Sequence, residues 1–155
     1  MKELKKLSEG ANYTAVSAGK FDEVRDYELQ MGPDVKMKGK VFTGQALKST
    51  GMEMSLQTFA PGEGSAFLHA HKTHEELYMV IKGEGEFRVD DDVFAVSEGS
   101  LVRVAPAGKR ALRNTGNGPM TVMCIQYKAD VFGADDSPMT DGVFIQGDVF
   151  PAAGK

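Results

Sequence analysis

The feature that most constrains the fold is a succession of short apolar segments, separated by turn sequences, between about residues 35 and 127. Turn-forming residues such as Pro61-Gly62 and Gly83-Glu84-Gly85 separate these segments. Short strands about 8–12 residues apart are typical of a β-sandwich or a β-barrel. No long run with a 3.6-residue period occurs, so we predict an all-β fold. The apolar segments are 35–42, 52–59, 77–81, 86–89, 92–96, 101–105 and 120–127.

The chain has 155 residues, a length that corresponds to one domain. Residues 1–32 mix charged and polar residues, and we interpret them as an N-terminal extension. We assign residues 33–127 to the barrel and residues 128–155 to a C-terminal extension. This last segment is rich in glycine, aspartate and proline, and its phenylalanines are expected to pack on the barrel or on a second subunit.

The charge distribution argues against a nucleic-acid partner. The formal net charge is −4, whereas binding to phosphates needs a basic surface. Residues 51–100 carry three Lys or Arg against ten Asp or Glu, and they contain all three histidines. Such an acidic, histidine-containing segment suits a cation. The single cysteine, Cys124, excludes a disulfide framework, and its apolar neighbours predict a small buried side chain.

We expect a cytoplasmic protein that does not bind membranes. The N-terminus lacks the apolar core of a signal peptide, and no segment approaches the roughly 20 apolar residues of a membrane span. A chain with one cysteine and no export signal is most often cytoplasmic.

The residues that suggest chemistry are two histidines and a glutamate close together in the sequence. His69 and His71 are two residues apart, so on an extended chain their imidazoles face the same way. After the short connection at 72–75, Glu76 opens the next apolar strand and can return its carboxylate to that face. Two neutral imidazoles and one carboxylate form a set of ligands with open positions for one divalent transition-metal ion, such as iron, manganese, nickel or zinc.

Neighbouring residues have more than one interpretation. Glu75 alternates with Glu76 and should face away, whereas Tyr78 shares the Glu76 face. The Tyr78 phenol is predicted to reach the pocket as a catalytic group, and the alternative is that it only fills the barrel. His74 is a fourth ligand or a proton shuttle in one interpretation and a solvent-exposed histidine in the other.

These residues resemble the first sequence motif of the cupin superfamily, G-x5-H-x-H-x3,4-E-x6-G. The chain has His69-x-His71, then four residues, Glu76, six residues and Gly83. Only the leading glycine is out of place. The resemblance implies a double-stranded β-helix, or jelly roll, with His69, His71 and Glu76 as metal ligands inside the barrel mouth.

The second cupin motif, G-x5-P-x-G-x2-H-x3-N, is matched only in part. Gly99, Pro106-Ala-Gly108 and Asn114 resemble it, but the histidine that completes the family's metal site is missing. Counting forward from Gly108 puts Ala111 in its place, and counting back from Asn114 puts Arg110 there.

The two registers predict different sites. An inward Ala111 leaves an open coordination position. An inward Arg110 adds a catalytic cation that binds an anionic substrate, or Arg110 is a solvated cation at the barrel rim. We favour an inward Arg110 because the asparagine end of the segment matches the family better.

The resemblance implies three candidate functions. The first is a metal-dependent enzyme acting on a small organic substrate, either as a dioxygenase or as an isomerase of sugars or keto acids. The second is a non-catalytic cupin that binds or senses a small molecule such as a sugar. The third is a barrel with a vestigial site. Cupins of this size commonly form homodimers, so a second copy of the chain is the expected protein partner.

Overall fold

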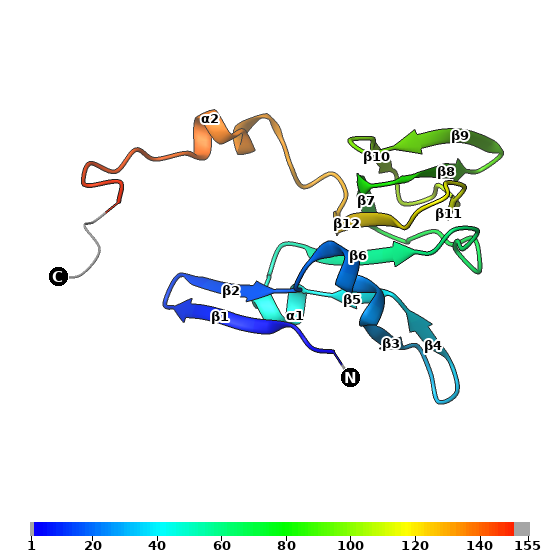
Figure 1. Ribbon diagram of the computed structural model, residues 1–155. Coiled ribbons are helices and arrows are strands. Elements are labelled where there is room, and N and C mark those ends of the chain that lie inside the picture. Colours follow the sequence, from blue (N-terminus) through cyan, green and yellow to red (C-terminus); the bar gives the residue numbers. More distant parts are fainter. Residues whose placement is uncertain (1, 151–155) are drawn as a thin grey trace.

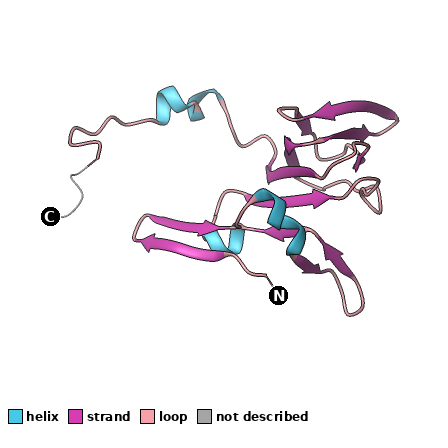
Figure 2. Cartoon of the chain, viewed as in Figure 1, coloured by secondary structure: helices cyan, strands magenta, loops and turns pink. Residues whose placement is uncertain are grey.

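The computed structural model describes residues 2–150, and β-strands dominate it (Figure 2). The strands are β1 (Lys5–Gly10), β2 (Tyr13–Ser17), β3 (Glu28–Gln30), β4 (Lys36–Lys38), β5 (Lys40–Phe42), β6 (Glu53–Phe59), β7 (His74–Lys82), β8 (Glu84–Val89), β9 (Asp92–Ser97), β10 (Leu101–Val104), β11 (Arg110–Asn114) and β12 (Met120–Lys128). The helical segments are short: η1 (Phe21–Asp26), α1 (Gly44–Leu47), η2 (Ala134–Asp136) and α2 (Pro138–Asp141). The all-β prediction is therefore confirmed.

Two antiparallel sheets form the barrel (Figure 1). The larger sheet has the strand order β10-β7-β12-β6-β5, and the smaller one has the order β11-β8-β9. In the larger sheet β7 and β12 are inner strands, and β7 alternates partly buried and buried residues from Glu75 to Ile81. Alternation with a period of two directs one set of side chains into the barrel and the other outward.

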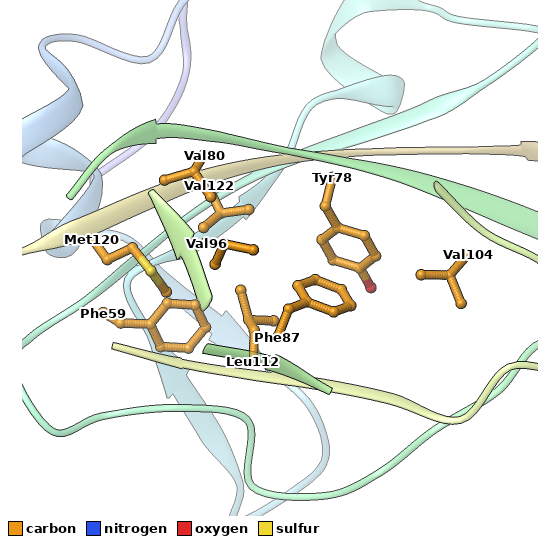
Figure 3. Packing of buried hydrophobic residues seen from close by; sticks show 9 residues of the cluster. All are labelled: Phe59, Tyr78, Val80, Phe87, Val96, Val104, Leu112, Met120 and Val122. Atoms are coloured by element: carbon orange, nitrogen blue, oxygen red, sulfur yellow. The ribbon is translucent and has the colours of Figure 1, made fainter. Parts of the chain in front are cut away.

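An apolar core fills the interior of the barrel. Nine buried residues form one cluster in Figure 3: Phe59, Tyr78, Val80, Phe87, Val96, Val104, Leu112, Met120 and Val122. The rings of Tyr78 and Phe87 meet edge to face, with centroids 4.9 Å apart. Since Tyr78 belongs both to this cluster and to the Glu76 side of β7, the core directly supports the candidate site.

The N-terminal residues add structure of their own. β1 pairs with β2 in a hairpin, and η1 packs against β6, where Val24 is fully buried. β3 pairs with β4, so position 32, where the sequence analysis ends the extension, lies in the turn of this second hairpin. The β3–β4 hairpin contributes residues to the cavities described below.

The last described residues leave the barrel. After β12 the chain runs away from both sheets, through η2 and α2 (Figure 1). Its apolar side chains are exposed, with Phe144 and Phe150 almost completely so. Within residues 2–150 no helix is long and apolar enough to cross a membrane.

Candidate metal centre

The two histidines come from the segment that connects β6 to β7. His69 forms an isolated bridge with Arg110, and this backbone contact holds the connecting segment against β11. The segment is extended at this point, so the rings of His69 and His71 face the same space, with centroids 5.3 Å apart and planes perpendicular. The predicted pairing of the two imidazoles is therefore present, although His71 lies outside the assigned strands.

Glu76 brings a carboxylate to the same space from β7. Its Oε1 lies 3.2 Å from His71 Nε2, and its Oε2 lies 3.8 Å from His69 Nε2. One ligand atom from each of the three residues falls within 4.8 Å of the others, a spacing that could hold a single metal ion.

The donor chemistry also fits an ion. Within residues 2–150, the Nε2 atom of His71 is buried and makes no aligned hydrogen bond, in spite of its proximity to Glu76. A buried imidazole nitrogen without a hydrogen bond is costly unless something else, such as a metal, occupies its lone pair. Burial lowers the pKa of His71, which favours the neutral form that coordinates a metal.

Arg110 lies inside the barrel, beside Glu76. Its side chain has no exposed surface, and its Nε lies 3.2 Å from Glu76 Oε2. The guanidinium also donates hydrogen bonds to backbone carbonyls, at 3.2 Å for Ala105 and 3.4 Å for His69. Binding of an anionic substrate by Arg110 stays a prediction; in the structure its guanidinium contacts the protein's own carboxylate and carbonyl groups.

Tyr78 also acts on Glu76. Its hydroxyl donates a hydrogen bond of 2.5 Å to Glu76 Oε2, so the phenol reaches the site as well as the core. Burial alone would raise the pKa of the Glu76 carboxyl, but contacts with His69 and Tyr78 and the charges of His71 and Arg110 lower it to about 2. The carboxylate is therefore ionised and held in one orientation.

Two residues that the sequence analysis does not assign to the site are present on β12. Cys124 Sγ lies 3.4 Å from Glu76 Oε1, and burial next to this carboxylate raises the pKa of the thiol to about 12. Gln126 Nε2 lies 3.2 Å from His71 Nδ1 and 3.0 Å from His74 Nδ1. The amide thus fixes the His71 ring from the side opposite to Nε2.

The remaining predicted residues lie outside the centre. His74 is exposed at the start of β7, where Gln126 links it to His71, and the two imidazole centroids are 6.3 Å apart. Glu75 faces away, as its alternation with Glu76 predicts, and pairs with Arg103 at 2.9 Å on the outer surface. Ala111 lines a separate surface hollow and does not face the histidines.

The candidate centre opens into two adjoining cavities. The inner one has a volume of about 190 Å³, and its lining includes His69, His71, Glu76, Cys124 and Gln126. The outer one has a volume of about 480 Å³ and lies toward the β3–β4 hairpin. Both are lined by Met31, Met37, Lys40, Phe67 and His69.

A two-sheet β-barrel with two histidines and a glutamate at its open end defines the class: a barrel protein with a candidate site for one metal ion. A family model described as "Cupin domain" matches residues 55–126, which span β6 to β12. A crystal structure of a cupin protein from Bacteroides fragilis is 31% identical, with a TM-score of 0.65, and the match covers 77% of this chain and 97% of that one. The chain belongs to the cupin family.

Two curated relatives cover less of the molecule. An uncharacterised protein from Methanocaldococcus jannaschii is 31% identical over 78 residues, which span 50% of this chain and 62% of the relative. The alginate biosynthesis protein AlgA from Pseudomonas putida is 27% identical over 100 residues, 57% of this chain. The matched region spans only 20% of AlgA.

Proposed function

We propose that this cupin is a metal-dependent enzyme that acts on a small, oxygen-rich organic molecule. The observation that carries the proposal is the convergence of His69, His71 and Glu76 within 4.8 Å beside a cavity. A divalent ion held by these residues would act as a Lewis acid on substrate oxygens or, in the case of iron, support oxidation by O2.

Other residues of the chain hold the proposed metal ligands in place. Arg110 and Tyr78 hold the Glu76 carboxylate from one side, so they are positioning residues that act through a ligand. Gln126 contacts the His71 ring at Nδ1; with its amide oriented so that Oε1 accepts from Nδ1–H, the lone pair of Nε2 would be free to coordinate. Partners of this kind orient ligands and tune their basicity.

Two reaction types are open for this site, oxidation by O2 and isomerisation of sugars or keto acids. The protein should be loaded in turn with Fe(II), Mn, Ni and Zn and tested with catechols, diketones, keto acids and sugars. We expect turnover with one metal and one substrate class, and no turnover in His69→Ala. Equal turnover by His69→Ala and wild type would contradict the proposal.

A non-catalytic small-molecule-binding cupin is the second candidate, and one observation favours it. The fully buried Arg110 already neutralises Glu76, so the barrel holds a charge-balanced carboxylate without an ion. A metal-free protein whose unfolding temperature rises with a sugar, and which turns over no substrate, would support this candidate.

A further inference from the structure

Lys40 extends from β5 toward the candidate metal centre. It lines the inner cavity together with His69, His71 and Glu76, and it also lines the outer cavity. Its ammonium lies over the face of the Phe42 ring, 5.1 Å from the ring centroid, as in a cation–π contact.

The carboxylates around the inner cavity are already engaged. Glu53 Oε1 accepts backbone hydrogen bonds of 2.6 Å from Gly44 and 3.0 Å from Met54. Glu76 is held by Arg110 and Tyr78. Lys40 has no ion pair within 4.0 Å among residues 2–150.

Lys40 is half-buried, and no carboxylate among residues 2–150 pairs with its ammonium. Burial is the main cause of its lowered pKa. A partly buried cation of this kind is stabilised by a bound anion, because charge-assisted hydrogen bonds replace the lost hydration. Arg110, by contrast, is fully enclosed, so Lys40 is the cation among the residues that line the inner cavity, whereas Arg25, Lys36 and Lys38 line the outer one.

The side chains around Lys40 indicate which other chemical groups the ligand has. Leu29, Met31, Met37 and Phe67 contribute apolar side chains to the inner cavity. Methionine side chains adapt to different apolar shapes. The cavity therefore combines an anion-binding group, a candidate metal centre and an apolar surface.

We propose that Lys40 forms an anion subsite, and that the substrate is a small organic carboxylate with an apolar body, such as a branched 2-oxo acid. This inference rests on the proposed function, since the metal would bind the oxygens next to the carboxylate. A carboxylate fits better than a phosphate, because one ammonium beside two glutamates suits a single negative charge. Phosphate sites usually offer several donors, an arginine fork or a helix N-terminus.

Binding of three probes to the metal-loaded full chain tests the inference by calorimetry. The probes are α-ketoisocaproate, its neutral analogue isobutyl methyl ketone, and pyruvate, which lacks the apolar body. Lys40→Met removes the charge and keeps most of the apolar stem. Lys109→Met is the matched control, because Lys109 is exposed and lines neither cavity. Metal content is measured first in every sample.

We expect α-ketoisocaproate to bind wild type more tightly than either other probe. Lys40→Met should weaken its binding about tenfold and leave the ketone unaffected, whereas Lys109→Met should match wild type. Retained metal with unchanged acid binding in Lys40→Met would overturn the subsite alone, and absence of metal from wild type would overturn the proposed function as well. Equal affinity of wild type for the acid and the ketone, or competition by inorganic phosphate alone, would overturn the carboxylate class.

Discussion

At the scale of single residues, the site combines residues that are close together in the sequence with residues that only strand pairing brings near them. His69, His71 and Glu76 could be found from the sequence because eight consecutive positions contain all three. Cys124 and Gln126 could not, because they face the site only through the pairing of Cys124 with Tyr78 and Gln126 with Glu76. Alternation predicts which residues share a face, but it does not predict which strand lies alongside.

Removing one partner of the buried pair of Arg110 and Glu76 should strongly destabilise the protein. Arg110→Met leaves the buried carboxylate without its cation and should lower the free energy of unfolding by about 3–5 kcal/mol. Arg103→Met removes the partner of Glu75 in an outward-facing pair whose arginine is exposed, and it should cost about 1 kcal/mol or less. Urea unfolding of the metal-free proteins measures both values.

A double variant tests whether the loss of stability comes from the charge interaction or from packing. Combining Arg110→Met with Glu76→Gln removes both charges, so the loss should be smaller than the sum of the two single losses. Additive losses would show that Arg110 contributes through packing and not through Glu76.

The lowered pKa of Glu76 predicts how stability depends on pH. Its carboxyl titrates near the ordinary value of 4.5 in the unfolded chain and at about 2 in the folded one. The contribution of the ionised form is thus complete above about pH 5 and decreases as the pH falls toward 2, by about 3 kcal/mol. The difference in unfolding free energy between metal-free wild type and Glu76→Gln should decrease over this interval. A difference that stays constant from pH 5 to pH 2 would contradict the ion pairing.

At the scale of elements, the apolar strands were predictable and a polar one was not. β7, β8, β9, β10 and β12 coincide with apolar runs in the sequence. β11 has the sequence RALRN, whose inward side chains include Arg110 and Asn114, so hydrophobicity alone does not identify it as a strand. The polar side chain of Asn114 can be buried because its amide donates hydrogen bonds to the carbonyls of Phe59 and Gly118, at 3.0 Å and 2.8 Å.

The turn between β7 and β8 depends on Gly83 for two reasons. Its φ is +85°, and an added Cβ would lie 2.6 Å from the Pro119 carbonyl oxygen. Gly99 has nearly the same φ, +86°, but open space around the position of a Cβ. Gly99→Ala should therefore cost only the backbone strain, about 1 kcal/mol, and Gly83→Ala about 3 kcal/mol. Thermal and urea unfolding of both variants compare them, and equal losses would rule out the close contact.

At the scale of the whole molecule, the barrel and the C-terminal segment are separate in space. From the sequence, residues 128–155 are expected to pack on the barrel or on a second subunit. Residues 131–150 extend away from the barrel (Figure 1). The side chains of Phe132, Phe144 and Phe150 are exposed. Docking of this segment on a second copy stays a prediction, and so does the homodimer. Sequence patterns identify the apolar anchors but do not specify what covers them.

The barrel should fold and keep its metal centre without the C-terminal segment. A chain that ends at Asp130 retains every strand that the structure describes, together with His69, His71 and Glu76. Its unfolding temperature should stay within about 2 °C of the full chain, because the removed side chains are exposed. A large decrease in unfolding temperature, or loss of bound metal, would show that the segment covers the barrel in solution.

The central claim is that His69, His71 and Glu76 bind one metal ion, and metal content per chain tests it most directly. Untagged protein is reconstituted with a divalent ion, dialysed and measured by elemental analysis, beside His69→Ala, Glu76→Gln and the outward-facing control Glu75→Gln. We predict about one ion per chain in wild type and in Glu75→Gln, less in Glu76→Gln and none in His69→Ala. No metal in wild type, or equal metal in wild type and His69→Ala, would contradict the account.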